Sequence, residues 1–362
     1  MKVGIIGTGN FARRAPLPAV ASSPGVELTA VFDVDAASAA NAAETYGAKT
    51  VADSRAQLLA MPLDLLFIVS PPYTHAEVLS DVIDAGIPFV CEKPAGISSS
   101  QVSALAARAD ARGLLHAVDH EFRYEPRVIR LKQAIDAGYL GKLRLSALTL
   151  VGAFAVDPEI DSMRWWSFHY SKPHGGGMLP HYASHLIDLH RHLFGGLEAV
   201  AGYTPHLIDA KPQRPSTPGG APGPMRPIDA EDSAALTARL PGGAPSTIAA
   251  SFACPCMPSL TWVMHGDRGA LIFDGGTGGW VGGATLRGMR LGEAGPVEIE
   301  VDDRLPEGIQ RGSPYYQELI KRLLQDVRQA LGKSQRTGRF ATLHDEAAIW
   351  KAIETWRAPV SS

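Results

Sequence analysis

Cysteine is scarce in this sequence. The 362 residues contain three cysteines, Cys91, Cys254 and Cys256. An odd and sparse set excludes a disulfide framework and is typical of a reducing compartment. Cys254 and Cys256 enclose one proline in a Cys-Pro-Cys sequence, which is at most half of a metal site, since no second cysteine pair accompanies it. We therefore predict no metal and expect ordinary buried or strand thiols.

Long hydrophobic runs and an excess of one charge are missing as well. No apolar run approaches the roughly 20 residues that cross a bilayer, and the opening "MKVGIIGTGN" lacks the pattern of a signal peptide. The formal net charge of −3 gives no reason to expect nucleic acid or an anionic membrane surface as a partner. Hydrophobic residues make up 45% and charged residues 20%, which is a globular composition. We expect a cytoplasmic protein of two domains.

Residues 1–121 alternate apolar runs with Ala-rich helical patterns. Several of these helical patterns close with glycine, at Gly47, Gly86 and Gly113. Strands that alternate with helices predict βαβ units, and hence a doubly wound parallel sheet of the Rossmann type. We predict that residues 1–121 form an NAD(P)-binding domain. The strand-like runs are "KVGIIG", "ELTAVFD", "LDLLFIVS", "IPFVC" and "LHAVD".

The pattern changes from residue 122 onward. A helical pattern ends near Gly138, and strand-like runs then follow one another without intervening helices. Such runs predict a large, mainly antiparallel, open-faced sheet, so the predicted class is α/β followed by α+β. Helical patterns return at 314–331 and 343–356, and the Pro/Gly-rich segment 205–230 is expected to be a long loop. The second domain is predicted to span 122–362. Its strand-like runs are "KLRLSALTLVGAF", "SAALTARL", "STIAASFA", "LTWVMHGD" and "GALIFDGG".

The segment "GIIGTGNFA" carries the dinucleotide-binding fingerprint G-x-G-x-x-A between a strand and a helix. Gly7 permits the tight turn, and Gly9 lets a pyrophosphate approach the backbone at the helix N-terminus. Ala12 lets the helix pack closely on the strand. The residues predicted to line the cofactor here are Gly7, Thr8, Gly9, Asn10 and Phe11.

Asp33 follows the second strand, about 20 residues beyond the fingerprint. A carboxylate there accepts hydrogen bonds from both ribose hydroxyls and repels a 2′-phosphate, which favours NAD over NADP. NADP stays open, because Arg13 or Arg14 is able to reach a phosphate.

A later strand ends in "SPPYTH", where open parallel sheets bind their ligands. We predict that Ser70, Pro71 and Pro72 contact the cofactor. His75 falls in the first turn of the next helix, and two interpretations stay open. It is either a neutral histidine near the cofactor ribose or a plain surface histidine.

Lys93, in "VCEKPAGIS", is a cation placed just after a buried strand. Three interpretations compete: a solvated surface residue, an ion-pair partner of Glu92, or a reactive amine. Desolvation in a pocket lowers the pKa of a lysine, and the positive ring of an oxidised nicotinamide acts in the same direction. Glu92 is predicted to help fix the cofactor end of the pocket.

The segment "GGGMLPHYASHLIDL" places His181, His185 and Asp188 at i, i+4 and i+7, which is one helix face. Two histidines four apart are able to bind zinc, but Tyr182 stands where a metalloprotease helix carries glutamate. A structural face is the second interpretation. The third makes His185 an acid/base group over a substrate, since histidine titrates near neutrality without help.

These segments together resemble the family of glucose–fructose oxidoreductase, inositol dehydrogenase and MocA (Gfo/Idh/MocA). The resemblance spans essentially the whole chain, and "EKP" with the later "GGG…H…D" is highly specific as a set. It implies that Lys93 and His185 line the site where hydride passes to or from the nicotinamide, with Asp188 in a supporting role. It also implies a homodimer or homotetramer formed through the open face of the second sheet.

The resemblance extends to "HEFRYEP", where it implies His120 near the nicotinamide and Arg123 in a structural or substrate-facing position. The segment "MRWWSFHY" offers Trp165 and Trp166, with Tyr170, as an aromatic wall for a sugar, although packing or a subunit interface explains them equally well. His181 departs from the family, because most sugar-oxidising relatives carry aspartate there. A neutral imidazole orients a hydroxyl but supplies no negative charge. His181 and Tyr182 are predicted to contact the substrate.

The sequence thus predicts an NAD-dependent oxidoreductase that transfers hydride to or from a secondary alcohol of a sugar, polyol or cyclitol. His185 is the predicted acid/base, and Lys93 polarises the substrate oxygen. Two alternatives share the same residues. One is an NAD-dependent glycosidase that oxidises its substrate transiently. The other is a regulator of the same fold that binds NAD(P) without turnover.

Overall fold

The structure, a computed structural model, describes residues 1–157, 169–213, 220–276, 284–303, 305–306, 309, 312–335 and 337–358. The chain divides into two compact units. Unit 1 consists of residues 1–124 and 305–348, and unit 2 of residues 125–304 and 349–362. Among the described residues, no helix is both long and apolar enough to cross a membrane.

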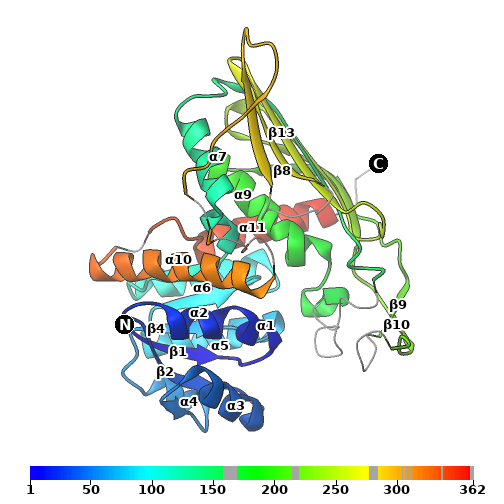
Figure 1. Ribbon diagram of the computed structural model, residues 1–362. Coiled ribbons are helices and arrows are strands. Elements are labelled where there is room, and N and C mark those ends of the chain that lie inside the picture. The colour runs from blue at the N-terminus through cyan, green and yellow to red at the C-terminus, as the bar shows by residue number, and fades with distance from the viewer. Residues whose placement is uncertain are drawn as a thin grey trace. The chain divides into compact units, whose positions relative to one another are not determined.

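Unit 1 is built on a parallel six-stranded sheet in the order β3-β2-β1-β4-β5-β6, with helices packed around it (Figure 1). This is the predicted Rossmann arrangement. The strand order reverses between β1 and β4, which opens a crevice at the carboxyl ends of these strands where nucleotides bind. The strands are β1 (Lys2–Ile6), β2 (Glu27–Phe32), β3 (Thr50–Val51), β4 (Leu65–Ile68), β5 (Phe89–Glu92) and β6 (His116–Asp119).

The helices of unit 1 begin and end where the sequence supplies caps. The Asp35 carboxylate accepts a hydrogen bond from Ser38 N at the start of α3, and Ser98 accepts one from Gln101 N at the start of α6. The chain leaves α3 and α5 through Gly47 and Gly86 in the left-handed conformation, as predicted. The helices are α1 (Asn10–Arg14), α2 (Pro16–Ser22), α3 (Ala36–Tyr46), α4 (Arg55–Leu59), α5 (Pro72–Ala85), α6 (Ser99–Ala111) and the 3₁₀ turn η1 (Glu121–Tyr124).

The chain returns to unit 1 near its C-terminal end. Helix α10 (Ser313–Gly332) lies beside α2 and contacts η1, and α11 (Leu343–Arg357) begins in unit 1 (Figure 1). The Tyr124 hydroxyl donates to Asp326 Oδ2 at 2.7 Å, which fastens η1 to α10. The division expected from the sequence, 1–121 and 122–362, differs from these units because the apolar face of α10 is buried within unit 1.

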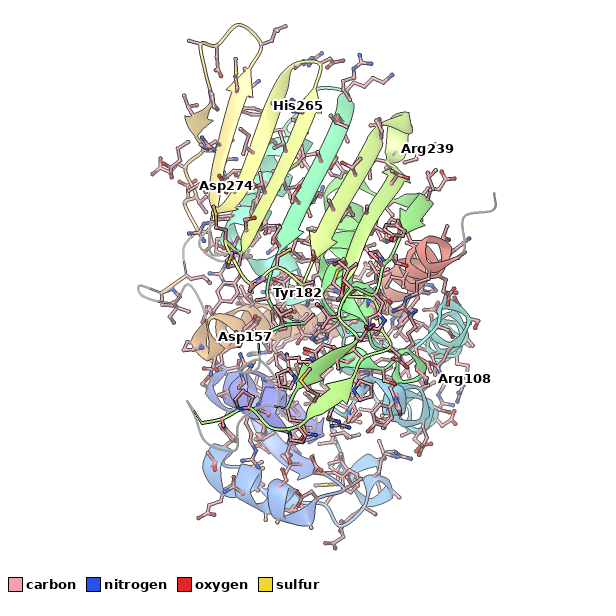
Figure 2. All side chains as sticks on the ribbon, turned by 90° about the vertical axis from the view of Figure 1, so that its right-hand side faces the viewer. Arg108, Asp157, Tyr182, Arg239, His265 and Asp274 are labelled. Carbon is pink, nitrogen blue, oxygen red and sulfur yellow. The ribbon has the colours of Figure 1, made fainter. Side chains whose placement is uncertain are left out.

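Unit 2 is built on an eight-stranded sheet in the order β16-β15-β14-β13-β7-β12-β11-β8. Neighbouring strands are antiparallel except β7 and β12, which confirms a mainly antiparallel sheet. Figure 2 shows this sheet from its open side, with Arg239, His265 and Asp274 upon it. The strands are β7 (Leu143–Val151), β8 (Glu198–Tyr203), β11 (Ser233–Arg239), β12 (Pro245–Ser251), β13 (Ser259–Gly266), β14 (Gly269–Gly276), β15 (Thr285–Arg290) and β16 (Val297–Glu298).

Helical segments pack on the other face of this sheet. The His190 ring of α9 lies 4.2 Å from the Trp262 ring of β13, and the Trp356 indole of α11 donates to Thr237 O at 3.0 Å. The segment expected to be a long loop, 205–230, contains a short ribbon of two strands, β9 (Ala210–Pro212) and β10 (Met225–Pro227). The helical segments are α7 (Pro126–Asp136), η3 (Lys172–His174), η4 (Leu179–Ala183), α9 (Ser184–Phe194) and η5 (Pro241–Gly243).

Candidate active site

Gly7 and Gly9 of the glycine turn are glycine for different structural reasons. Gly7 has φ +93°, and a Cβ there would lie 2.7 Å from Ser70 N. Gly9 has no other residue within 4 Å of an added Cβ, so the space in front of it is open. Gly7 is therefore required by the fold, whereas Gly9 leaves room for a ligand. This arrangement fits the pyrophosphate of a dinucleotide, whose charge is matched by backbone N–H groups at such turns.

Asp33 is fixed beside this turn. Its Oδ2 accepts hydrogen bonds from Thr8 N at 2.7 Å and Thr8 Oγ1 at 3.1 Å, and its Oδ1 accepts one from Asp35 N at 2.9 Å. The carboxylate thus lies at the end of β2, as the sequence predicted. The Thr8 side chain is buried, and Asn10 and Phe11 form the first residues of α1.

Arg13 is held by the protein itself. Its Nε donates to Thr8 O at 2.9 Å, one Nη donates to Ser38 O at 2.8 Å, and the other donates to Asn41 Oδ1. The Arg14 guanidinium lies 6.0 Å from the Tyr316 ring centroid. Arg13 therefore braces the glycine turn against α3, which makes it a poor candidate for a 2′-phosphate ligand.

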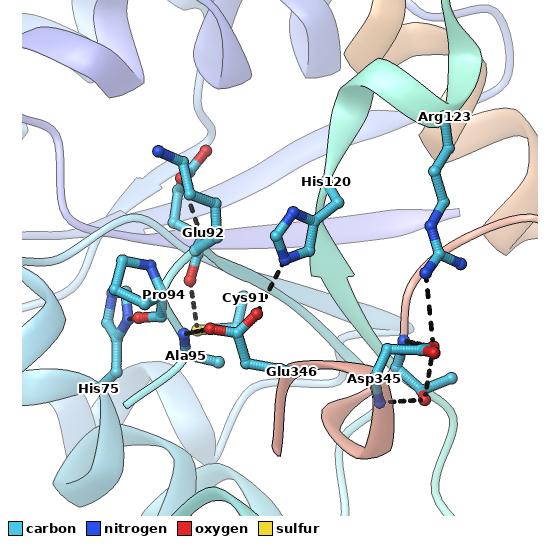
Figure 3. Close-up of polar contacts among 11 residues, drawn as sticks. His75, Cys91, Glu92, Pro94, Ala95, His120, Arg123, Asp345 and Glu346 are labelled. Carbon is cyan, nitrogen blue, oxygen red and sulfur yellow. Dashed lines mark hydrogen bonds and ion pairs between the residues drawn. The ribbon is translucent and has the colours of Figure 1, made fainter. Parts of the chain in front are cut away.

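His75 is fully buried, so its interpretation as a surface histidine is wrong. Its two ring nitrogens lie 2.6 Å from Ser70 O and 2.8 Å from Pro94 O. The ring therefore joins the loop after β4 to the turn that carries Lys93, and Figure 3 shows it beside Pro94 of that turn. Burial lowers the pKa of His75, although both carbonyl contacts oppose that shift. Pro71 and Pro72 start α5 beside this loop.

Three buried carboxyl groups surround the backbone position of Lys93. Glu92 ends β5 and Asp119 ends β6, and the two residues are register partners of neighbouring strands. Glu121 follows in η1. Glu92 Oε2 accepts a hydrogen bond from Lys93 N at 3.0 Å. Lys93 itself is only partly exposed, which disfavours the solvated surface interpretation.

The environment of these carboxyls disfavours their ionised forms. Burial, followed by the charge of Glu121, raises the pKa of Glu92 to about 8. Burial, followed by the charge of Asp119, raises the pKa of Glu121 to about 8. Burial and the neighbouring Glu92 raise the pKa of Asp119 well above its usual range. Lys93 lowers the pKa of each of them, but by less.

His120 and Arg123, predicted near the nicotinamide and the substrate, are both bound within unit 1. The His120 Nε2 lies 2.8 Å from Glu346 Oε2, and both side chains are buried. Glu346 Oε1 also accepts from Ala95 N at 3.3 Å, so α11 holds the turn after Lys93 (Figure 3). Arg123 donates to Arg339 O at 3.1 Å and lies 3.7 Å from Asp345, which supports its structural interpretation.

In unit 2, the predicted histidine helix begins with a π turn. Residues 179–183 form η4, which contains His181 and Tyr182, and α9 follows with His185 and Asp188. His185 and Asp188 are buried, at 4% and 1% exposure. The spacing argument assumed a continuous α-helix, and it did not anticipate this turn. Such π turns are frequent at functional sites.

His181 lies against a second histidine. The His169 and His181 ring centroids are 3.7 Å apart. Both rings line a cavity of about 20 Å³, the room of one water molecule, together with Tyr170 and Glu231. The Tyr170 hydroxyl donates to Phe154 O at 2.7 Å and so faces the protein. Trp165 and Trp166, predicted to form an aromatic wall, lie outside the described residues.

Glu231 was not identified from the sequence. Its Oε1 accepts hydrogen bonds from Leu179 N at 3.2 Å and from the Arg357 guanidinium at 2.6 Å. The carboxylate therefore anchors the start of η4, just before His181. No local pattern marks Glu231, because it reaches η4 from a distant loop. No local pattern marks Asp119, Glu121 and Glu346 either, because the fold brings them toward Lys93 from β6, η1 and α11.

Asp110, His116 and His344 form a second cluster of unit 1, with donor atoms near enough to hold a metal ion. The His116 Nδ1 accepts a hydrogen bond from Leu343 N at 3.2 Å, so a neutral ring carries its proton on Nε2. That nitrogen lies 3.2 Å from Asp110 Oδ1 and serves as a donor to it. The cluster therefore ties α6, β6 and α11 together and is not a suitable ligand set.

Both parts of the chain match one protein family. The family described as "Oxidoreductase family, NAD-binding Rossmann fold" matches residues 1–120, and the "GFO/IDH/MocA C-terminal domain" matches residues 128–272. Levoglucosan dehydrogenase of Pseudarthrobacter phenanthrenivorans is 27% identical over 293 residues, which is 76% of this chain and 73% of that protein. D-glucoside 3-dehydrogenase of Escherichia coli is 27% identical over 54% of each chain.

Solved structures agree with this fold. Levoglucosan dehydrogenase in its apo form superposes with a TM-score of 0.82 at 22% identity, covering 98% of this chain and 96% of that one. Its complex with NADH and levoglucosan has a TM-score of 0.81 at 19% identity, covering 98% and 95%. The chain belongs to the Gfo/Idh/MocA family of NAD-binding oxidoreductases.

Proposed function

We propose that this protein is an NAD-dependent dehydrogenase that oxidises a secondary hydroxyl of a sugar or a related polyol. The observation that carries the proposal is the placement of Lys93 and Asp33 at the carboxyl edge of one parallel sheet. Asp33 follows β2 and Lys93 follows β5, on opposite sides of the crevice between β1 and β4. A dinucleotide spans such a crevice, with its adenosine ribose at the β2 side and its nicotinamide at the other.

The family relatives support the substrate class. Levoglucosan dehydrogenase and D-glucoside 3-dehydrogenase are, by name, dehydrogenases of sugar compounds. We propose that the Lys93 ammonium polarises the substrate oxygen and that His185 takes the hydroxyl proton. A cation at that oxygen stabilises the alkoxide character that develops as the proton leaves. NAD supplies the acceptor for the hydride that leaves the same carbon.

His181 is the residue we expect to separate this protein from relatives with aspartate there. Its ring centroid lies 3.7 Å from that of His169, and the Glu231 carboxylate fixes the backbone just before it. An imidazole presents one donor and one acceptor, whereas a carboxylate presents acceptors only. In relatives with aspartate at this position, a carboxylate would select a substrate hydroxyl that donates a hydrogen bond. We therefore propose that a different substrate group faces His181 in this protein.

The proposal is tested by offering sugars, cyclitols and simple glycosides to the purified protein with NAD or NADP while the absorbance of the reduced cofactor is followed. Net NADH formation with a free sugar is the expected result, with NAD preferred over NADP. Release of an aglycone without net NADH identifies a glycosidase instead. Tight cofactor binding without turnover of any compound identifies a regulator.

Two variants assign the roles. Lys93→Met and His185→Asn are each expected to lower kcat by about a hundredfold or more while NADH still binds. Lys132→Met changes a partly exposed lysine of α7 that pairs with Asp136, so it serves as the control and is expected to retain activity. A Lys93→Met protein that folds, binds cofactor and keeps full turnover would refute the role of this amine.

We also propose that the protein works in the cytoplasm as a homodimer or homotetramer. The free thiols of Cys91, Cys254 and Cys256 support a reducing compartment. The open face of the unit 2 sheet supports self-association. This face carries Val263 and Ile272, which are partners on neighbouring strands β13 and β14.

A further inference from the structure

The proposed reaction assigns no chemical step to the carboxyl groups of Glu92, Asp119 and Glu121, here called the carboxyl cluster. Their exposures are 8%, 0% and 3%, so water solvates none of them well. Glu92 Oε1 and both carboxyl oxygens of Asp119 lie buried without a hydrogen-bond partner. A buried ionised carboxylate without partners is costly, and this cost favours the protonated, neutral form of the carboxyl group.

Burial has a larger effect on the carboxyl cluster than the charges near it. Lys93 lowers the pKa of all three carboxyls, and His120 lowers the pKa of Asp119 and Glu121. His120 is itself matched with the Glu346 carboxylate of α11 at 2.8 Å. The neighbouring Tyr316 of α10 is partly buried, and Glu121 and Arg14 have opposite effects on its pKa. Burial therefore outweighs the effect of Lys93 and His120, and at neutral pH the carboxyl cluster retains protons.

The topology of unit 1 places the carboxyl cluster at the nicotinamide half of the crevice. Glu92 and Asp119 are the last residues of β5 and β6, which lie on the β4 side of the strand reversal. Asp33 occupies the opposite, adenosine side at the end of β2. The oxidised nicotinamide ring carries one positive charge, and the reduced ring carries none. The carboxyl cluster thus lies on the side of the sheet where the nicotinamide ring is expected, and the charge of that ring changes by one unit on reduction.

We propose that the carboxyl cluster is a proton store governed by the redox state of the cofactor. It releases a proton to solvent when NAD⁺ binds, because the cation favours the ionised carboxylate. It regains its affinity for a proton once the ring is neutral. This second half rests on the proposed dehydrogenase function: the electron pair of the substrate C–H bond leaves as hydride, and the hydroxyl proton passes through the active-site base to the cluster. One proton per turnover then reaches solvent when the next NAD⁺ binds.

Isothermal titration calorimetry tests the first half without any sugar. NAD⁺ and NADH are titrated into the full-length protein near pH 7 in two buffers of different ionisation enthalpy, and the difference gives the number of protons released. We expect release approaching about one proton with NAD⁺ and markedly less with NADH. The affinity for NAD⁺ should rise with pH by up to about tenfold per unit below pH 8, while that for NADH changes little. Equal proton release with the two cofactors overturns the proposal.

Variants locate the proton. Asp119→Asn removes one carboxyl and should abolish at least half of the difference between NAD⁺ and NADH. Glu44→Gln, an exposed carboxyl change on α3, should leave that difference intact. An Asp119→Asn protein that melts cooperatively and keeps the full difference contradicts the proposal. If that variant does not fold, the wild-type comparison of NAD⁺ with NADH still decides. If NAD⁺ binding releases a proton but no sugar is turned over, the inference about NAD⁺ binding holds and the proposed function is wrong. The two proposals are therefore tested separately.

Discussion

At the scale of single residues, the glycine turn was predictable because its constraints are local. The spacing of Gly7 and Gly9 defines the turn, and Asp33 follows at the distance that one βαβ unit fixes. His75 was placed correctly at the start of a helix, but its burial was not predictable. Its two partners, Ser70 O and Pro94 O, come from different loops that only the folded sheet brings together.

Substitution of the two glycines should separate folding from binding. Gly7→Ala forces a Cβ to within 2.7 Å of Ser70 N at a φ of +93°, so we expect a loss of about 1–3 kcal/mol in unfolding free energy. Gly9→Ala meets no protein atom within 4 Å and should melt like the wild type. It should nevertheless weaken NADH binding by about tenfold or more, because the added methyl fills the ligand space. Thermal melts and NADH fluorescence titrations measure both effects. An unchanged NADH affinity in Gly9→Ala contradicts the assigned pyrophosphate position.

Replacement of His75 should disturb the Lys93 turn from a distance. His75→Phe keeps an aromatic ring but removes the N–H that a neutral His75 donates to one of two carbonyl oxygens, Ser70 O or Pro94 O, in a buried site. We expect a stability loss of about 2 kcal/mol or more, with a larger fall in kcat than in NADH affinity, since the lysine turn loses one of its fastenings. His265→Phe, at an exposed position on β13, is the control. A His75→Phe protein with wild-type stability argues against a buried hydrogen bond from His75.

At the scale of elements, strands with strong apolar character were predictable and weakly patterned ones were not. β1, β4 and β13 were predicted from branched and aromatic residues. β8 is largely exposed along its length, and β3 and β16 have two residues each, so neither length nor pattern marked them. The π turn of η4 was also missed, because spacing alone cannot distinguish a continuous α-helix from one with a single wider turn.

The carboxyl cluster should make the stability of the cofactor-free protein fall as the pH rises toward 8. The folded pKa values of Glu92 and Glu121, about 8, lie above the usual carboxyl value of 4.5. The native state therefore binds more protons than the unfolded chain between those values, so stability is highest below about pH 4.5 for these groups and falls as pH rises toward 8. Each carboxyl contributes a slope of up to about 1.4 kcal/mol per pH unit.

Asp119→Asn should flatten this slope, because removal of the neighbouring carboxyl lets Glu92 ionise at lower pH. Urea denaturation of the cofactor-free wild type and variant from pH 5 to 8 provides the measurement, with Glu44→Gln as the matched change at an exposed site. A wild-type stability that rises steadily with pH over this window, or an Asp119→Asn slope equal to that of the wild type, contradicts the raised pKa values.

At the scale of the whole molecule, the two-part organisation followed from the change of pattern near residue 122. The return of residues 305–348 to unit 1 did not. An amphipathic pattern such as that of α10 shows that one face is buried, but it does not identify the element that buries it. The contacts of α10 with α2 and η1 are long-range, and Glu346 reaches the Lys93 turn only through this return.

Self-association should depend on the open face of the unit 2 sheet. Val263 of β13 pairs with Ile272 of β14 and with Ala147 of β7, and the three side chains project from the same face because register partners share it. Each is partly buried in a single chain, and a second copy with the same face would cover them.

Val263→Glu should weaken the association by about a hundredfold or more, since it places carboxylates against an apolar surface at the centre of the interface. Val34→Glu, at a position 95% exposed in unit 1, should leave it unchanged. Light scattering at micromolar concentration is expected to give the mass of two or four chains for the wild type and Val34→Glu, and a smaller mass for Val263→Glu. A monomeric wild type, or a Val263→Glu protein with the wild-type mass, would show that this face is not where the chains meet.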